Sequence, residues 1–213
     1  MDFIDKALET YAKEHTTPEP DSWVELTRET WLNKLHPRML SGHLQGAFLS
    51  MISQMINPDR ILEIGTFTGY SALALAKGLS KTGLLYTLDI NKEHESLALK
   101  HFATDGISQK VKMIIGNALE IIPTLNEKWD LVFIDADKIN YLEYFDLVFD
   151  KVKPGGWIIA DNALWSGKVL IETDLKDKDT AAIKEFNDKI QADQRIENML
   201  LPFRDGLMLM RKK

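Results

Sequence analysis

The chain has 213 residues, of which 45% are hydrophobic and 27% charged, as in a soluble globular protein with one sizeable core. Its net charge of −6 argues against non-specific binding to nucleic acid or to an anionic membrane. The lack of cysteine excludes disulfides, thiolate metal sites and a cysteine nucleophile. No signal peptide begins at Met1 and no apolar run is long enough to cross a bilayer, so we expect a cytoplasmic protein.

Helical patterns fill residues 1–56, ahead of the first strand. The predicted helices span residues 2–14, with apolar Phe3 and Ile4, then Trp23–Lys34, capped by Asp21 or Ser22, and roughly 43–56. They are expected to pack on a sheet or to cover a site. Most of their side chains fit plain packing. Ser41 is a candidate site residue because it begins the third helix in a loop that contains glycine.

A strand, a tight turn and a helix follow. Ile61–Ile64 is an apolar run that predicts a buried strand, Gly65 and Gly69 form the turn, and Ser71–Lys77 is helical. Glycines allow positive φ or close approach of a ligand, and ligands of open α/β sheets bind beyond the carboxyl ends of the strands. The spacing differs from the G-x-G-x-x-G of dinucleotide binders. Glu63 lies inside the apolar strand, so its carboxylate should face a hydroxyl or an ammonium group.

The alternation of strands and helices continues to the end of the chain. Further strands are expected at Leu84–Asp89, Val111–Ile115, Asp130–Asp135, Trp157–Asp161, Ile196–Leu201 and Leu207–Met210, and helices at 92–102, after Ala118 up to Leu125, and at 178–192. A short Asp-Gly loop joins the last two strands as a hairpin, so the final strand should be antiparallel. We therefore predict one α/β domain over 1–213, with helices in 1–56 and the core in 57–213.

Asp89 ends the second strand, about 20 residues after the glycine turn. An acid at this place commonly accepts hydrogen bonds from ribose hydroxyls. The alternative is that Asp89 only caps the following helix. The preceding glycine turn favours the ribose role.

Two other strand ends concentrate chemistry. The fourth strand runs into Asp135 and the fifth into Asp161 and Asn162, which supply three hard oxygen ligands suited to Mg²⁺, Ca²⁺ or Mn²⁺. Histidine is missing from this set, which disfavours zinc. Lys138 is close enough in sequence to act as a general base beside a dication. Either aspartate alone reads better as a helix cap, but their convergence on one sheet edge favours a metal site.

Three ordered segments, Leu62–Ser71, Phe133–Tyr141 and Gly155–Trp165, resemble the metal-dependent S-adenosylmethionine O-methyltransferases of the caffeoyl-CoA O-methyltransferase family. Catechol O-methyltransferase is a more distant relative. The tail from Phe186 to Gly206 also matches. The resemblance implies a Rossmann-like class I methyltransferase domain, with helices on both faces of a mostly parallel seven-stranded sheet whose last strand is reversed, and it implies a homodimer.

The resemblance also implies roles for single residues. Asp135, Asp161 and Asn162 match the family's metal ligands, Lys138 its base, and Met39, Trp165 and Asp193 its acceptor positions. The positions that match cofactor contacts are Ser41, Glu63, Gly65, Thr66, Ser71, Asp89, Ala118, Asp135, Asp137 and Tyr144. Of these, Asp89 would take the ribose hydroxyls, Ala118 would lie by the adenine, and Ser71 would hold the cofactor carboxylate.

The sequence departs from the family pattern in places that concern the acceptor. Ser166 stands where plant members commonly carry asparagine, Gln45 stands where an acid is usual, and the N-terminus lacks a basic segment. Arg38 and Lys34 are too few to replace that segment, although Lys168, Lys176 and Lys178 could supply charge. We therefore expect a free catechol to be preferred over a CoA thioester.

The expected reaction uses a divalent cation, Mg²⁺ foremost, to bind both oxygens of a vicinal diol and to lower the pKa of one hydroxyl. The resulting phenolate attacks the methyl group of S-adenosylmethionine, and Lys138 takes the proton. Two alternatives belong to other classes. A dehydrogenase with NAD is opposed by the missing third glycine, and a non-catalytic methyltransferase-like binding module is opposed by the intact candidates for metal ligands and base.

Overall fold

The computed structural model describes residues 4–172, 174 and 176–213, so Phe3 of the first predicted helix lies outside the described residues. Packing divides the chain into two compact units, one made of residues 5–117 and one of residues 118–213 together with Ile4. The expectation of a single domain stays a prediction. The two units are described in turn.

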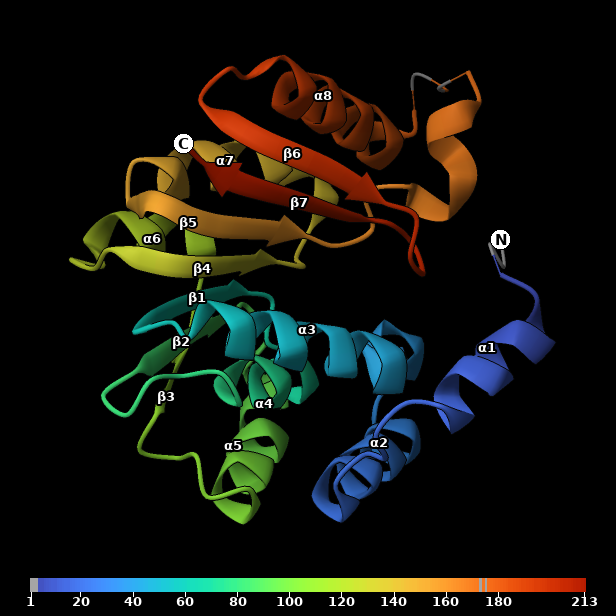
Figure 1. The fold of residues 1–213 in the computed structure, drawn as a ribbon, viewed down its shortest axis with the longest axis vertical. Coiled ribbons are helices and arrows are strands. Elements are labelled where there is room, and N and C mark those ends of the chain that lie inside the picture. The colour runs from blue at the N-terminus through green and yellow to red at the C-terminus, as the bar shows by residue number, and fades with distance from the viewer. Residues whose placement is uncertain (1–3, 173, 175) are drawn as a thin grey trace. The chain divides into compact units, whose positions relative to one another are not determined.

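The unit of residues 5–117 contains three parallel strands and five α-helices (Figure 1). The strands are β1 (Arg60–Ile64), β2 (Leu84–Asp89) and β3 (Val111–Ile115), and β2 pairs with both of the others. The helices are α1 (Lys6–Glu14), α2 (Asp21–Asn33), α3 (Gly42–Ile56), α4 (Tyr70–Ala76) and α5 (Glu95–Thr104), and 3-10 turns occupy Pro37–Met39 and Lys92–His94. All seven residues of α4 are buried, which fits a helix packed against both α3 and β2.

Helix α3 approaches the segment after α4 very closely. A Cβ atom at Gly78 would lie 2.0 Å from the carbonyl carbon of Ser53, so only glycine fits there. The buried Ser53 hydroxyl donates to the carbonyl of Leu75 at 2.6 Å. These two contacts fix α3 against the connection that leads from α4 into β2.

Helix α2 is tied to the rest of its unit by polar contacts as well as by apolar ones. Trp23 Nε1 and the Ser22 hydroxyl both donate to the carboxylate of Asp105, the former at 3.0 Å. The fully buried Thr30 hydroxyl donates to Thr68 Oγ1 at 3.0 Å. The predicted cap at Asp21 or Ser22 is wrong, because the helix begins after Pro20 without a side-chain cap and Ser22 is used to hold Asp105.

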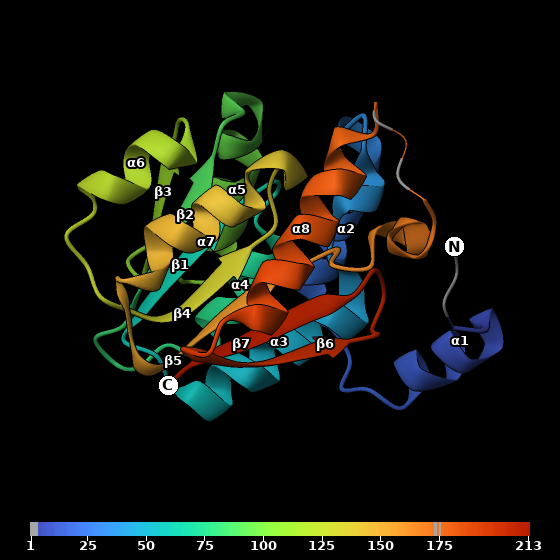
Figure 2. The same ribbon diagram turned by 90° about the horizontal axis from the view of Figure 1, so that it is seen from above.

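The second unit contains four strands, three α-helices and two 3-10 segments within the described residues. The strands are β4 (Trp129–Ile134), β5 (Val152–Ala160), β6 (Ile196–Leu201) and β7 (Leu207–Lys212). The helices are α6 (Ala118–Thr124), α7 (Tyr141–Phe149) and α8 (Lys178–Ala192), and the 3-10 segments are Lys138–Asn140 and Trp165–Leu170. Figure 2 shows α7 and α8 side by side over one face of these strands.

The strand pairing confirms the predicted topology. Strand β5 runs parallel to β4, while β7 is antiparallel to both β5 and β6. The strand order is β3-β2-β1 in the first unit and β4-β5-β7-β6 in the second, seven strands in all with the last strand reversed as expected. Among the described residues, no helix is both long and apolar enough to cross a membrane.

Candidate functional site

The chain turns sharply after β1 through a loop with two glycines of positive φ, Gly65 at 105° and Gly69 at 92°. A Cβ atom at Gly69 would lie 2.8 Å from the ring of Phe102, which leaves no room for a larger residue. Phe67, between the glycines, also has a positive φ of 48°, a strained conformation that surrounding contacts must hold. The predicted tight glycine turn is confirmed.

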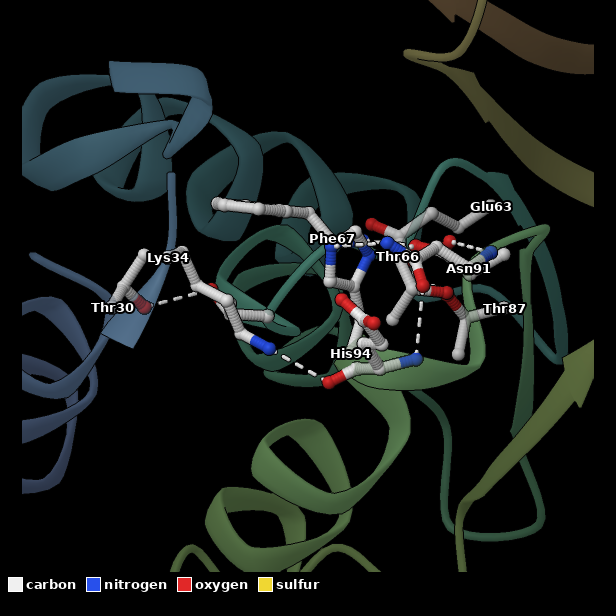
Figure 3. Close-up of polar contacts among 11 residues, drawn as sticks. Thr30, Lys34, Glu63, Thr66, Phe67, Thr87, Asn91 and His94 are labelled. Carbon is white, nitrogen blue, oxygen red and sulfur yellow. Dashed lines mark hydrogen bonds and ion pairs between the residues drawn. The ribbon is translucent and has the colours of Figure 1, made fainter. Parts of the chain in front are cut away.

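Glu63 is fully buried in β1, and the expectation that it faces a hydroxyl is confirmed. The Thr87 hydroxyl donates to Glu63 Oε2. Since the single proton of Thr87 is used in this way, the hydroxyl of Thr66 must donate to Thr87 Oγ1 in turn. Figure 3 shows these three side chains together. These hydrogen bonds join Glu63 to Thr66 at the start of the glycine loop.

Asp89 ends β2 and is 8% exposed. Its Oδ2 accepts the Phe67 main-chain N–H at 2.6 Å, and its Oδ1 accepts the Asn91 main-chain N–H at 2.7 Å. His94 Nδ1 lies 3.2 Å from Oδ2. Asp89 therefore joins the glycine loop to the turn after β2, so it does more than cap the following helix.

The other predicted cofactor positions differ in their surroundings. Ser41 precedes α3 and Ser71 lies in α4, and each is 7% exposed. In the unit of residues 118–213, Ala118 begins α6 and is 8% exposed. The Tyr144 hydroxyl donates to Asp137 Oδ1, and burial together with this carboxylate raises the pKa of Tyr144. Tyr144 thus stays protonated and fixes the side chain of Asp137.

The predicted metal ligands lie at two neighbouring strand ends. Ile134 of β4 is opposite Ala160 of β5 in a parallel register, so the next residues along each strand are Asp135 and Asp161. The Asp161 main-chain N–H donates to the Ile134 carbonyl at 2.9 Å, which continues the pairing past the last residue of β4. The expected convergence of these two strand ends is confirmed.

Lys138 is 8% exposed and is held over these strand ends. Its Nζ donates to Asp135 Oδ1 at 3.1 Å and to the Tyr141 hydroxyl at 2.6 Å. Tyr141 in turn donates to the Asp161 carbonyl at 3.0 Å. Complete burial, with nearby Asp135 and Asp161, raises the pKa of Tyr141 well above its usual value. Tyr141 therefore stays a neutral phenol that links the lysine to both strand ends.

Asn162 adopts the left-handed conformation, with a φ of 58°. Its main-chain N–H donates to Asp161 Oδ1 at 2.7 Å, and its side-chain Nδ2 lies 3.4 Å from Asp205 Oδ2. Asp205 Oδ1 accepts the Ser166 main-chain N–H. A carboxylate only accepts hydrogen bonds, so Asp205 selects the orientation in which Asn162 Nδ2 faces it and Oδ1 faces away.

The β6–β7 turn is fitted closely to the loop that follows Asn162. Ala163 and Leu164 donate their main-chain N–H groups to the carbonyls of Gly206 and Asp205, both at 2.9 Å. A Cβ atom at Gly206 would lie 2.7 Å from the Leu164 nitrogen. The sequence pattern predicts a hairpin here, but it does not indicate that Asp205 binds Asn162. Its Asp-Gly pair was the available signal, but the partner is 43 residues away.

The donor set at the strand ends fits a hard cation. Two carboxylates and an amide oxygen that faces away from its hydrogen-bond partner are the ligand types that Mg²⁺, Ca²⁺ and Mn²⁺ prefer. Among the residues that the structure describes, no three His, Cys, Asp or Glu side chains form a metal-binding group. The proposed set has only two carboxylates and takes its third ligand from the amide of Asn162, so it is not a group of that kind.

The three predicted acceptor positions have different environments. Met39 ends the 3-10 turn Pro37–Met39 and is 59% exposed. Trp165 lies with its ring centroid 5.9 Å from Lys138 Nζ. Asp193 is bound by Arg195, whose guanidinium hydrogen bonds hold the pKa of Asp193 below its usual range. The Asp193 side chain is 9% exposed, and its ion pair with Arg195 satisfies the carboxylate even when no methyl acceptor is bound.

Comparison with known proteins gives consistent matches along the whole chain. The model of a family described as O-methyltransferase matches residues 13–213. Caffeoyl-CoA O-methyltransferase 5 of Nicotiana tabacum is 35% identical over 207 residues, which cover 91% of this chain and 85% of that protein.

Two solved structures superpose on nearly the entire fold. The O-methyltransferase of Bacillus cereus, in complex with SAH, has a TM-score of 0.90 and 30% identity, and 97% of each chain is covered. TomG of Streptomyces achromogenes, an O-methyltransferase involved in tomaymycin synthesis and solved with SAM, has a TM-score of 0.90 and 26% identity, with 97% and 96% coverage.

Proposed function

This chain belongs to the S-adenosylmethionine-dependent O-methyltransferase family that includes the caffeoyl-CoA O-methyltransferases, and we propose that it methylates one hydroxyl of a catechol with the help of a divalent cation. The family assignment replaces both alternatives, a dehydrogenase and a non-catalytic module. The enzyme transfers a methyl group to a small-molecule acceptor. The observation that carries the proposal is the parallel register that sets Asp135 beside Asp161, with Lys138 bound to the former.

In the proposed cation site, Asp135, Asp161 and the Oδ1 atom of Asn162 supply the ligands. A divalent cation held there would lower the pKa of a bound hydroxyl and would favour acceptors with two neighbouring oxygens. The chain orients its own ligands in advance, since Asp205 turns the amide of Asn162 and the β4–β5 register aligns the aspartates. Such outer contacts fix the geometry of a metal site before the ion arrives.

Lys138 is the proposed general base. Tyr141 and Asp135 hold its amine at a fixed place, and the neutral amine would accept the proton of the reacting hydroxyl. The acceptor oxygen then forms a bond to the methyl carbon as the bond from that carbon to sulfur breaks. The products are the methyl ether, S-adenosylhomocysteine and protonated Lys138. The main contribution of the protein is alignment of the reactants and exclusion of water.

For the cofactor, we assign the ribose hydroxyls to Asp89, the adenine to the surroundings of Ala118, and the carboxylate to Ser71. The remaining proposed contacts are Ser41, Glu63, Gly65, Thr66, Asp135, Asp137 and Tyr144. Support for Asp89 comes from its fixed carboxylate, which the Phe67 and Asn91 main-chain groups hold at the end of β2. Met39, Trp165 and Asp193 are proposed acceptor contacts. A homodimer and a cytoplasmic location stay predictions.

A screen of acceptors with methyl-labelled cofactor tests the proposal. Catechols, matched monophenols and matched CoA thioesters are each incubated with the enzyme, with and without an excess of chelator. We expect more labelled product from a free catechol than from its CoA thioester and little from the monophenol, and we expect the chelator to abolish the product and added Mg²⁺ to restore it. Equal turnover of catechol and monophenol, or full turnover in chelator, would contradict the metal-assisted mechanism.

A further inference from the structure

Three side chains at the end of β2 and in the turn after it form a connected polar group, of which the proposed function uses only Asp89. Asp89 ends the strand, Asn91 caps the 3-10 turn Lys92–His94, and His94 closes that turn. His94 Nδ1 lies 3.2 Å from Asp89 Oδ2, and Asn91 Nδ2 lies 3.3 Å from His94 Nε2. The His94 side chain is 15% exposed, so these contacts are largely shielded from water.

The protons in this group have one consistent arrangement. Asn91 Oδ1 accepts the main-chain N–H of Glu93 at 3.0 Å, which fixes the orientation of the amide. Asn91 Nδ2 must then donate to His94 Nε2, because an amide nitrogen cannot accept. With Nε2 acting as the acceptor, the neutral ring carries its proton on Nδ1 and donates it to Asp89 Oδ2.

His94 also packs against the glycine loop. Its ring meets that of Phe67 edge to face, with centroids 4.9 Å apart and an interplanar angle of 83° (Figure 3). The turn that carries His94 is fixed from the other side by Lys34 at the end of α2, whose Nζ donates to the Glu93 carbonyl at 2.7 Å. His94 is therefore part of a rigid turn that contacts both Asp89 and the loop.

We propose that His94 is a positioning residue for cofactor binding, which holds the Asp89 carboxylate in the orientation that receives the ribose hydroxyls. Oδ2 of Asp89 takes donors from Phe67 and His94, and Oδ1 takes one from Asn91. These donors stop the carboxylate from rotating, so the ribose meets a carboxylate that is already oriented. This inference rests on the proposed ribose role of Asp89.

Titration calorimetry with S-adenosylhomocysteine at pH 8 tests the role of His94. His94→Phe keeps a ring against Phe67 but removes the donor to Asp89, and we expect its affinity to fall by about tenfold, in line with the loss of a hydrogen bond to a charged group. His94→Asn keeps an N–H near the position of Nδ1 and should recover most of the affinity. His15→Phe, just after exposed α1, is the matched control and should bind as the wild type does.

A double-mutant cycle with Asp89→Ala separates this inference from the assignment of Asp89 itself. If His94 acts through Asp89, His94→Phe should cost nothing further in the Asp89→Ala background. Unchanged affinity of Asp89→Ala alone would overturn both the ribose role and this inference. A tenfold loss in Asp89→Ala, with none in His94→Phe or with full additivity of the two losses, would overturn the role of His94 alone.

The proton arrangement gives an independent readout that a mere packing role would not produce. Nitrogen-15 NMR of the folded wild type should show a proton on Nδ1 of His94 and an acceptor nitrogen at Nε2. In Asn91→Leu, where Nε2 loses its donor, we expect the cofactor affinity to fall and this preference to weaken. A proton on Nε2 with none on Nδ1 in the wild type would overturn the inference, because Nδ1 could not then donate to Asp89.

Discussion

The exchange of Asp205 for asparagine probes how the chain orients Asn162, a proposed metal ligand. Both carboxylate oxygens of Asp205 are in use, Oδ1 by the Ser166 main-chain N–H and Oδ2 by Asn162 Nδ2. In Asp205→Asn the new side chain keeps one acceptor oxygen, so its NH₂ group must face one of these two donors. Where the NH₂ group faces Asn162, the clash is relieved when the amide of Asn162 turns over, which would direct Nδ2 in place of Oδ1 toward the proposed cation site.

Loss of an outer partner of a metal ligand typically costs about 10- to 100-fold in metal affinity. For Asp205→Asn we therefore expect Mn²⁺ affinity to fall by this factor, or by about 1.4–2.7 kcal/mol. Affinity for S-adenosylhomocysteine measured without metal should stay within about twofold, since Asp205 is hydrogen-bonded to Asn162, Leu164 and Ser166, which are not proposed cofactor contacts. Calorimetric titration of each ligand into each variant gives both numbers.

Asp130→Asn is the matched control for Asp205→Asn. Asp130 is an aspartate of the same unit whose carboxylate pairs with Lys153 Nζ at 2.7 Å, at the opposite end of β4 from Asp135. Its exchange should leave Mn²⁺ affinity unchanged. Equal Mn²⁺ affinities for wild type, Asp130→Asn and Asp205→Asn would refute the reasoning that Asp205 sets the orientation of Asn162.

Three further predictions follow from buried groups and from the acceptor positions. Thr30→Val removes the hydroxyl that donates to buried Thr68, which should lower the free energy of unfolding in urea by about 1–3 kcal/mol. Thr30→Ser should restore this stability, and equal stability of all three proteins would show that the α2 contact is dispensable. The raised pKa values of Tyr141 and Tyr144 stabilise the fold fully below about pH 10, and this stability is lost as the pH rises through the pKa values of the folded state. Urea midpoints of Tyr144→Phe should therefore fall less steeply above about pH 10 than those of the wild type. Parallel curves for the two proteins would contradict this prediction. Because the chain carries a net charge of −6 and Lys168 is already paired with Asp177, kcat/KM should be higher for a free catechol acid than for its CoA thioester; a tenfold preference for the thioester, about 1.4 kcal/mol in transition-state binding, would refute that expectation.

Much of the fold follows from local sequence signals. The predicted bounds of β2 (Leu84–Asp89) and α8 (Lys178–Ala192) agree with the structure, because strong apolar patterns end there at polar residues. Strand β5 is longer than predicted and contains the Pro-Gly-Gly segment that the sequence indicates as a turn. Within β5, Val152 pairs with Trp129 and Trp157 with Leu131, so residues 153–156 lie in a register shift, where Gly155 keeps the positive φ of a turn, 79°.

Helix α7 was not predicted, although its buried residues Tyr141, Tyr144, Phe145, Val148 and Phe149 have helical spacing. The strand ends could be predicted, since parallel strands place their carboxyl ends at one edge of a sheet. The contacts of Asp205 with Asn162 and of Thr30 with Thr68 join residues 43 and 38 positions apart, and no local pattern encodes them. His94 lies only five residues from Asp89, yet its role depends on the folded geometry of the turn.

The central claim is that methyl transfer depends on a cation held by Asp135, Asp161 and Asn162. Its most direct test measures methyl transfer to a catechol by wild type and Asp161→Ala, with S-adenosylhomocysteine affinity determined in parallel. We predict that Asp161→Ala loses turnover and keeps cofactor affinity, and that wild type treated with chelator behaves in the same way until Mg²⁺ is returned. Turnover by Asp161→Ala at the wild-type rate, or by chelated wild type at its full rate, would contradict the claim.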